Sequence, residues 1–361
     1  MPLVAHIPSP TLDYLRKRGE NVLELGQALD QDIRELHIGF LNMMPDSALG
    51  VTERQFMRLV GSSNQIAQLF FHPFTIAGLT RGKEAQSYID QYYLPFEQLK
   101  EEGLDALIIS GANVANPILE QEPFWEALYE VIDWAADNVT SVLCSCLATH
   151  AIVKAIHGVE RERLPNKRWG VYPHRISLVD HPLLRDINTR FDVPHSRYND
   201  VSREQLEAAG MTILADGEDS GVHLAVSPDQ FRVVYFQGHP EYDRISLLKE
   251  YKREVERFAT GHREDYPPHL VNYFSSEVAE IVDAYEATVR ECQQNDTTPP
   301  PFPESQIEPL LDNTWLDTGK SIVNNWLGMV YRLTNNDRKI SFAEGVDPND
   351  PLGILNLKSK P

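Results

Sequence analysis

A short apolar stretch that ends in two cysteines limits most strongly what this chain can fold into. Residues 139–143 are a short run of β-branched and apolar residues, as in a strand buried inside a parallel sheet. Over residues 147–156 apolar side chains recur at intervals of three and four, which predicts a helix. Cys144 and Cys146 lie at the junction. The pattern predicts a strand, a sharp turn and a helix, with a thiol at the turn.

The position of Cys146 favours chemistry, whereas that of Cys144 favours packing. A thiol at such a turn faces out from the sheet edge beside a helix N-terminus, whose dipole and free N–H groups lower the pKa of a thiol. Cys146 is therefore a candidate nucleophile. Cys144 still belongs to the strand, where most cysteines are apolar fillers. From this stretch alone, a packing role for Cys146 also stays open.

The chain before this stretch alternates strands with helices, which predicts an α/β fold with a mostly parallel sheet flanked by helices. Residues 43–50 are expected to be a loop, with Thr52 capping the next helix. The expected strands are 36–42, 65–71 and 104–110, and the expected helices are 53–60 and 124–138.

The chain after this stretch adds strands that are expected to be partly antiparallel, followed by helices. Residues 164–174, which contain basic side chains, are expected to be a loop. The expected strands are 175–179, 191–198, 212–215, 222–227 and 233–237, and the expected helices are 246–260, 277–293 and 315–334.

This pattern predicts three parts in the 361-residue chain. Residues 1–35 are an N-terminal arm, and residues 36–265 are the α/β catalytic domain. Residues 266–361 are a helical extension that packs on the core and ends in a loose tail.

The composition indicates in which compartment the protein works and excludes some classes of partner. The net charge of −20 argues against nucleic-acid binding, and an anionic small substrate would need a local basic pocket. There is no signal-peptide pattern and no apolar run that could span a bilayer, so no membrane partner is expected. The three cysteines form no disulfide framework, which favours the cytoplasm. Cysteine and histidine show no zinc-type spacing, so no metal site is predicted.

The second informative stretch is Gln237–Tyr242, at the end of a predicted strand. His239 follows a glycine and precedes a proline, which is unusual for a core histidine. Glu241 lies where a turn can bring its carboxylate to the imidazole, fixing the tautomer while the other ring nitrogen takes a proton. Strands that end at Cys146 and at Gly238 deliver both to the carboxyl edge of the sheet. These residues predict a nucleophile, a base and an orienting acid.

Acyl transfer also needs donors for a developing oxyanion. The N–H of Leu147, at the start of the helix, is one candidate. Gly111-Ala112, where the neighbouring strand ends, can supply a second from the backbone of Ala112, although a plain turn explains the glycine equally well.

Five separated motifs together resemble the homoserine O-succinyltransferase family of homoserine O-acyltransferases. The resemblance extends from about residue 36 to residue 334 and implies a flavodoxin-like fold similar to the class I glutamine amidotransferases. The motifs are the Cys146 turn, the Gly-His-Pro-Glu-Tyr-Asp run at 238–243, and residues 41–45, 194–198 and 325–327.

The resemblance implies that an acyl-CoA acylates Cys146 and that the acyl group then passes to the hydroxyl of L-homoserine, in methionine biosynthesis. His239 is then the base and Glu241 its partner. The acyl-CoA is a co-substrate, no cofactor is bound, and the protein is a homodimer. The family's substrate-contacting positions match Lys167 and Ser196, and the pair that holds the amino acid matches Glu250 and Arg253. Glu250 and Arg253 are three residues apart, which puts them on one helix face. Without the resemblance, this spacing indicates only an ordinary surface salt bridge.

Two positions depart from the family pattern. The family has an oxyanion-assisting lysine where this chain has Asp46-Ser47, so the Ser47 hydroxyl or a backbone N–H would take its place. At the position that separates acyl donors, the family has glutamate with acetyl-CoA and glycine with succinyl-CoA. This chain has Ala115, which leaves room and adds no repelling carboxylate, so succinyl-CoA is favoured.

Three alternatives remain at this point. The first is acetyl transfer from acetyl-CoA to homoserine or serine. The second is a glutamine amidotransferase-like hydrolase, although Ser145 and Leu147 stand where glycines flank such a nucleophile. The third is a non-catalytic binding protein, which the lost lysine suggests.

Overall fold

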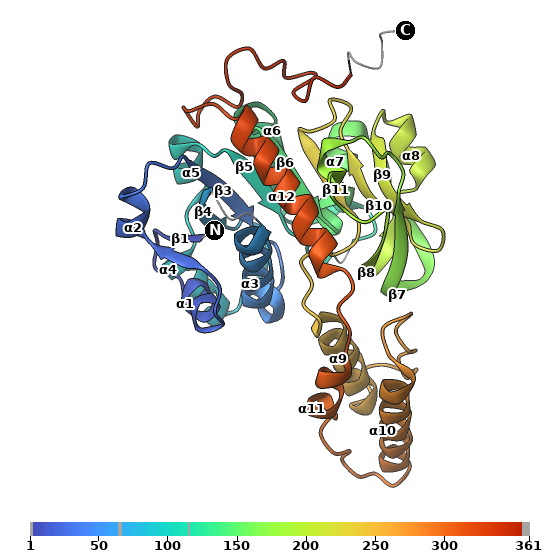
Figure 1. Ribbon diagram of the computed structural model, residues 1–361. Coiled ribbons are helices and arrows are strands. Elements are labelled where there is room, and N and C mark those ends of the chain that lie inside the picture. The colour runs from blue at the N-terminus through green and yellow to red at the C-terminus, as the bar shows by residue number, and fades with distance from the viewer. Residues whose placement is uncertain (1–2, 64–66, 115, 356–361) are drawn as a thin grey trace.

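A single sheet runs through most of the chain (Figure 1). The computed structural model describes residues 3–63, 67–114 and 116–355. Across the sheet the eleven described strands follow the order β2-β1-β4-β3-β5-β6-β11-β10-β9-β7-β8. Their bounds are β1 Leu3–Ala5, β2 Val22–Glu24, β3 Glu35–Leu41, β4 Gln68–Phe74, β5 Ala106–Ile109, β6 Ser141–Ser145, β7 Glu162–Ile176, β8 Arg190–Asp200, β9 Thr212–Gly217, β10 Gly221–Val226 and β11 Val233–Phe236.

The two halves of the sheet differ in strand direction. From β2 to β11 in this order, every neighbouring pair is parallel, whereas the remaining pairs, from β11–β10 to β7–β8, are antiparallel. The predicted fold class is therefore confirmed. In register, Cys144 pairs with Ile109 of β5 and with Tyr235 of β11. The segments that leave β5, β6 and β11 consequently meet at one edge, where open α/β sheets bind ligands.

Helices cover both faces of the sheet and bury two separate apolar cores (Figure 1). On one face α3 (Asp46–Ser63) lies beside α12 (Leu316–Leu333), whose fully buried Trp326 donates its indole N–H to Ser141 Oγ of β6 at 2.8 Å. The other core contains residues of α5 (Phe96–Glu102), α6 (Trp125–Asn138), α7 (Leu147–His157) and α8 (Arg203–Ala208).

A third core builds a lobe that extends below the body in Figure 1. It packs Trp169 and Val171 of β7 against residues of α9, α10 and the segment that follows them. The helices of this lobe are α9 (Ser246–Ala259), α10 (Ser276–Gln294) and α11 (Glu304–Ile307).

The N-terminal residues add strands to the sheet rather than only an arm. Leu3 of β1 pairs with Leu69 of β4, and β1 pairs in turn with β2. Between these strands lies α1 (Pro10–Lys17), and α2 (Leu25–Leu29) follows them; α4 (Lys83–Tyr92) lies further along the chain. The division of the chain at residues 35 and 265 stays a prediction.

Two local predictions are wrong. The loop expected at 43–50 ends early, because α3 begins at Asp46 and Thr52 lies inside the helix. Pro45 followed by an acidic residue is a helix-start signal that outweighs the later threonine.

The loop expected at 164–174 belongs to β7. Its partner β8 does not begin until Arg190, after β7 has ended at Ile176, and the pairing is irregular between Arg163 and Arg168, where Pro165 lies. Local sequence therefore gave no sign of this strand.

Candidate active site

Cys146 lies at a strained turn between β6 and α7. Its backbone has φ 54° and ψ −114°, a conformation that non-glycine residues rarely adopt. The N–H of Cys146 donates to the carbonyl of Phe236 at 2.8 Å, so β11 holds the turn in place. Gly111 faces it: a Cβ built on Gly111 would lie 3.6 Å from Cβ of Cys146 and 3.8 Å from the amide nitrogen of Leu147. The predicted strand, turn and helix are confirmed.

His239 is buried between the thiol and a carboxylate. Its Nδ1 lies 2.7 Å from Oε1 of Glu241, and a second hydrogen bond joins the ring to Cys146. Burial alone lowers the pKa of His239, but the charges of Glu241 and Cys146 and their hydrogen bonds outweigh this and raise it to about 10. The imidazole is therefore held in its protonated form beside the sulfur.

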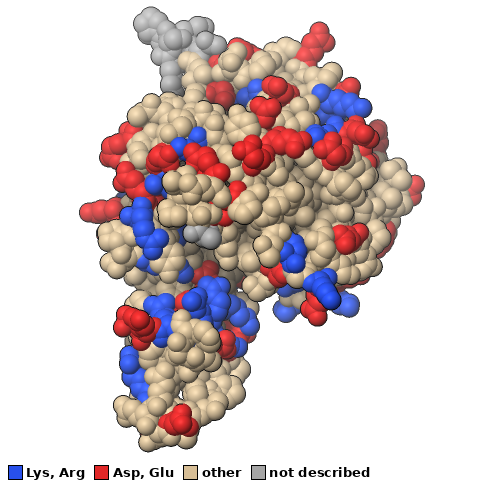
Figure 2. All heavy atoms as spheres, turned by 180° about the vertical axis from the view of Figure 1, so that it is seen from behind, with Lys and Arg blue, Asp and Glu red and all other residues tan. Residues whose placement is uncertain are grey.

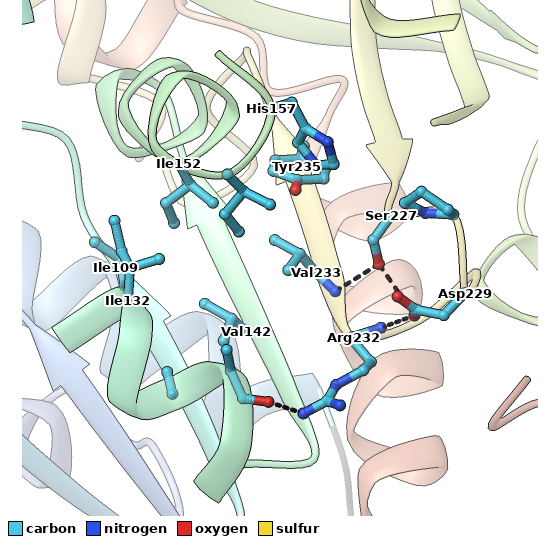
Figure 3. A pocket seen from close by; sticks show the side chains of 14 residues that line it. Ile109, Ile132, Val142, Ile152, His157, Ser227, Asp229, Arg232, Val233 and Tyr235 are labelled. Carbon is cyan, nitrogen blue, oxygen red and sulfur yellow. Dashed lines mark hydrogen bonds between the residues drawn. The ribbon is translucent and has the colours of Figure 1, made fainter. Parts of the chain in front are cut away.

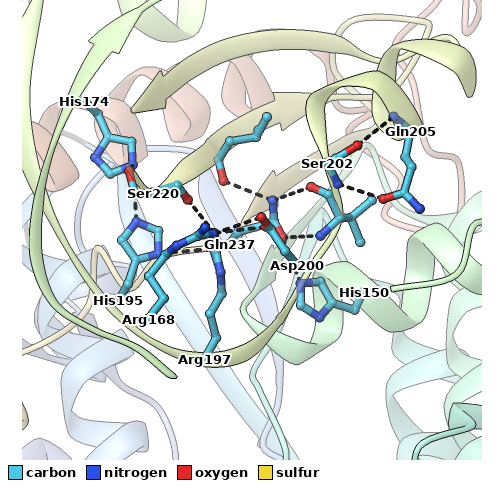
Figure 4. Close-up of polar contacts among 12 residues, drawn as sticks. His150, Arg168, His174, His195, Arg197, Asp200, Ser202, Gln205, Ser220 and Gln237 are labelled. Atoms are coloured by element: carbon cyan, nitrogen blue, oxygen red, sulfur yellow. Dashed lines mark hydrogen bonds and ion pairs between the residues drawn. The ribbon is translucent and has the colours of Figure 1, made fainter. Parts of the chain in front are cut away.

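Hydrogen bonds to neighbouring segments fix the turn that contains His239. The N–H of His239 donates to the Pro194 carbonyl of β8 at 2.9 Å. The buried Gln237 side chain accepts from the N–H of Val201 and donates to the carbonyls of Val201 and Val222, each at 3.0 Å (Figure 4). Its Oε1 also lies 2.9 Å from Nε2 of His150, so contacts with three strand or loop backbone groups and one helical side chain fix the end of β11.

A buried polar network supports the β7–β8 hairpin behind His239 (Figure 4). Arg168 and Arg197 both contact the carboxylate of Asp200, at 2.9 and 3.0 Å. Arg197 also lies 3.2 Å from Nδ1 of His195, whose Nε2 lies 3.3 Å from Nε2 of His174. Burial lowers the pKa of His174 to about 4, so this ring stays neutral at pH 7.

Glu250 of α9 is the centre of a second cluster. Its Oε2 accepts from Trp169 Nε1 at 3.0 Å and from Ser196 Oγ at 2.5 Å, and it forms an ion pair with Lys167 at 3.2 Å. Its Oε1 accepts from the hydroxyl of Tyr242 at 2.8 Å. The structure thus brings together three of the predicted substrate residues, from β7, β8 and α9.

Charge inside this cluster is balanced. Burial alone raises the pKa of Glu250, but the charge of Lys167 and the hydrogen bonds from Ser196 and Tyr242 hold it below its usual value. Burial lowers the pKa of Lys167, although the charge of Glu250 and its hydrogen bond oppose this shift. Tyr242 also stacks on the His239 ring, with centroids 4.1 Å apart. The two clusters therefore touch through one aromatic ring.

Arg253 lies on the same cavity wall as Glu250 but does not pair with it. Its Nε contacts Glu254 at 3.2 Å, and its side chain is 60% exposed. The salt bridge that spacing alone suggested is thus absent from the described residues. Glu250, Arg253, Ser47 and Tyr242 line one cavity of about 800 Å³.

The three predicted oxyanion donors differ in where the structure places them. Leu147 begins α7, so its N–H has no partner inside the helix. Ala112 follows Gly111 and packs against the apolar core. Ser47 lies in the first turn of α3 on the cavity wall, and no hydrogen bond joins it to Cys146 within the described ranges. Ala115, which the resemblance predicts to separate acyl donors, lies outside the described residues.

Asp46 replaces the family lysine and has a structural role. It accepts from the N–H of Gly82 at 2.7 Å and lies 3.4 Å from Arg81. Arg81 also donates to the carbonyls of Met44 and Asn42, so it fixes the loop that precedes α3.

Three contacting residues had no role in the sequence prediction: Ser145, Trp169 and Tyr242. Ser145 Oγ donates to Glu241 at 3.3 Å, and the other two donate to Glu250. Tyr242 follows Glu241 directly, and an aromatic residue with a hydroxyl beside a catalytic pair was a usable signal. Trp169 was hidden in the expected loop.

A second cavity, of about 250 Å³, lies between α6, α7 and the sheet (Figure 3). Its wall is mostly apolar, with Ile109, Ile132, Val142 and Ile152 as typical members. Its polar wall residues Ser227, Asp229 and Arg232 bond to one another, and no residue of the Cys146 or Glu250 clusters lines it, so we do not assign the reaction to this cavity. No group of metal-ligating side chains occurs among residues 3–63, 67–114 and 116–355, and no helix described there is long and apolar enough to cross a membrane.

Comparison with known proteins identifies the family. A model of the homoserine O-succinyltransferase family matches residues 2–336. The chain belongs to the homoserine O-succinyltransferase family. Relatives with that name from Methylococcus capsulatus and Allochromatium vinosum are 58% and 56% identical, over 98% of this chain and 100% and 99% of theirs. The resemblance read from the five motifs is thereby confirmed.

Solved structures are much more distant. A glutamine amidotransferase from Thermotoga maritima is 13% identical with a TM-score of 0.41, over 82% of this chain and 98% of that one. Another, from Methylobacillus flagellatus, is 12% identical with a TM-score of 0.43, over 82% and 95%. Likenesses of this size carry no argument about function, and the fold class stands on the sheet itself.

Proposed function

We propose that this protein moves a succinyl group from succinyl-CoA, through a thioester on Cys146, to the hydroxyl of L-homoserine, as a step of methionine biosynthesis. The observation that carries the proposal is the hydrogen-bonded set Cys146, His239 and Glu241 at the strained turn, in a chain of this family.

The acylation half-reaction starts from a thiolate beside a protonated imidazole. The sulfur attacks the thioester carbonyl of the donor, and the N–H of Leu147 faces the developing oxyanion. The sulfur of CoA leaves and takes the proton of His239, so free CoA departs and neutral His239 remains. Glu241, on Nδ1, keeps the ring oriented throughout.

The transfer half-reaction uses the same imidazole in reverse. Neutral His239 takes the proton of the homoserine hydroxyl as its oxygen attacks the acyl carbon on Cys146. The sulfur leaves as a thiolate, and the product ester departs. Each turnover therefore restores the starting charge pair without any further reagent.

Glu250 is the proposed anchor for the ammonium group of homoserine. Oε2 already contacts three partners, whereas among the described residues Oε1 accepts a hydrogen bond from Tyr242 alone, so an acceptor position remains on Oε1. Arg253, on the same cavity wall, is the proposed partner of the homoserine carboxylate.

Arg161 favours succinyl over acetyl as the acyl group. Its guanidinium donates to the carbonyls of Asn116 at 3.1 Å and Pro117 at 3.4 Å, and no carboxylate forms an ion pair with it in the part of the chain that the structure describes. Burial lowers the pKa of Arg161, and the nearby charges of Glu122, Cys146 and Glu160 oppose that shift. A cation within electrostatic range of the sulfur suits an acyl chain that ends in a carboxylate.

Mass spectrometry of the intact protein, mixed separately with succinyl-CoA and acetyl-CoA, tests the proposal. We expect a stable succinyl adduct, which disappears when homoserine is added and is not removed by serine. Cys146→Ala should form no adduct, whereas the control Cys292→Ala, in α10, should behave as wild type. Normal turnover by Cys146→Ala would end the covalent mechanism.

We further propose a homodimer with no bound cofactor, as the family resemblance implies, and a cytoplasmic location, which the small number of cysteines favours. Light scattering should give about twice the chain mass of 41.1 kDa. A mass of one chain at working concentration would contradict the dimer.

A further inference from the structure

The large cavity is basic, although the whole chain is acidic. Its cations come from α3, from α9 and from the residue that directly follows α1. In the rear view of Figure 2, lysine and arginine gather where the lower lobe meets the body, while groups of acidic side chains are scattered over the body. With a net charge of −20, this local excess of cations is unusual. The basic residues on its wall are Arg18, Arg54, Arg58, Lys249 and Arg253, and they outnumber the acidic ones, Glu20, Asp243 and Glu250.

Three of these cations already contact carboxylates. Arg58 contacts Asp243, Lys249 contacts Glu304, and Arg253 contacts Glu254. Arg18 and Arg54 have no such ion pair anywhere in the described residues.

Arg18 and Arg54 instead share one aromatic ring. The guanidinium carbons lie 5.3 Å and 5.0 Å from the centre of the Tyr14 ring, which is 42% exposed. Cation–π attraction holds each guanidinium at the ring. Two like charges held at one ring, without a carboxylate, repel each other, and a bound anion would remove that cost.

We propose that Arg18, Arg54 and Tyr14 bind the phosphate groups of the acyl-CoA donor. This inference rests on the proposed function. Guanidinium groups bind phosphate oxygens in a bidentate way, and Tyr14 presents both of them toward the same cavity.

The same cavity borders on residues that lie next to the reaction site. Its wall also contains Met44 and Tyr242. The sulfur of Met44 lies 3.8 Å from a Cβ built on Gly111, which faces Cys146, and Tyr242 stacks on His239. A long donor can therefore place its thioester at Cys146 while its phosphates reach α1 and α3.

The test compares two donors on each variant. One is succinyl-CoA, and the other is S-succinyl-N-acetylcysteamine, which has the same thioester but no phosphate. For Arg18→Gln and Arg54→Gln we expect kcat/KM of acylation with succinyl-CoA to fall about tenfold each, and with the short donor to stay unchanged. The double variant should lose about a hundredfold with succinyl-CoA only.

Arg16→Gln is the matched control, because Arg16 lies on the same helix but pairs with Asp13 and Glu24. This variant should leave kcat/KM of acylation unchanged with both donors. If wild type is acylated by both donors and the double variant keeps their ratio, the phosphate site is wrong while the proposed function stands. If wild type is acylated by neither donor, the proposed function itself fails. Equal losses with both donors would mean a fold defect and would also overturn the inference.

Discussion

At the scale of single residues, the proton on His239 links catalysis to stability. Its pKa is raised from 6.5 to about 10 by its two charged neighbours, so the folded protein holds a proton that the unfolded chain releases earlier. The resulting stabilisation is complete below the unfolded pKa and is lost as the pH rises through the folded one.

Glu241→Gln should remove much of this stabilisation, because the amide has no charge to favour the imidazolium. We expect the variant to be less stable than wild type by about 1–3 kcal/mol below pH 6.5. The difference should shrink as the pH approaches 10. Urea unfolding across this range measures it, and a difference independent of pH would contradict the charge argument.

A second residue-scale prediction concerns the acyl group. Arg161→Gln should lower the rate of acylation by succinyl-CoA relative to butyryl-CoA, which has the same carbon chain but no carboxylate, by about tenfold to a hundredfold. CoA release under single-turnover conditions measures both rates. Arg163→Gln is the control for losing a positive charge, since Arg163 lies over the Tyr198 ring. An unchanged ratio in Arg161→Gln would remove this residue from donor recognition.

At the scale of elements, local patterns predicted well and distant pairings did not. The strand, turn and helix around Cys146 follow from apolar periodicity within eighteen residues, 139–156. The turn at His239 was predicted from the glycine before it and the proline after it. Strand β7 depends on β8, with Trp169 opposite Ser196, and nothing near residue 169 announces that partner. The Glu250 cluster was likewise invisible as a network, because its members come from four separate segments.

Gly238 shows how tightly the end of β11 is packed. A Cβ built there would lie 2.5 Å from Val193 Cγ1 and 2.9 Å from both His195 Cε1 and His223 Nδ1. Gly238→Ala should therefore cost about 1–3 kcal/mol of unfolding free energy and shift His239, lowering acylation. Gly328→Ala is the control: nothing lies within 4 Å of that site in α12, so it should be neutral or stabilising by up to about 1 kcal/mol. Equal stability of both variants would contradict this packing.

At the scale of the whole molecule, the C-terminal helix joins both halves of the sheet. The core that contains Trp326 also contains Leu36 of the parallel half and Leu224 of the antiparallel half. Asn325, from the fifth family motif, donates to the carbonyls of Leu183 and Arg185, so this motif holds the fold together rather than touching substrate.

Trp326→Ala should consequently destabilise the body as a unit, by about 3–5 kcal/mol, and leave a single unfolding transition. Tyr331→Ala, on the same helix but 37% exposed, should cost less than about 1 kcal/mol. Urea unfolding followed by far-UV circular dichroism separates the two. Independent melting of α12 alone would contradict a shared core.

The backbone conformation of Cys146 also implies a conflict between the stability of the fold and the presence of a nucleophile. Glycine adopts its left-handed conformation without strain, whereas a side chain there costs about 1–3 kcal/mol. Replacing the cysteine by glycine would therefore relax the turn and abolish the nucleophile in one change. Cysteine at this position therefore lowers the stability of the fold, and selection for stability alone would favour glycine there.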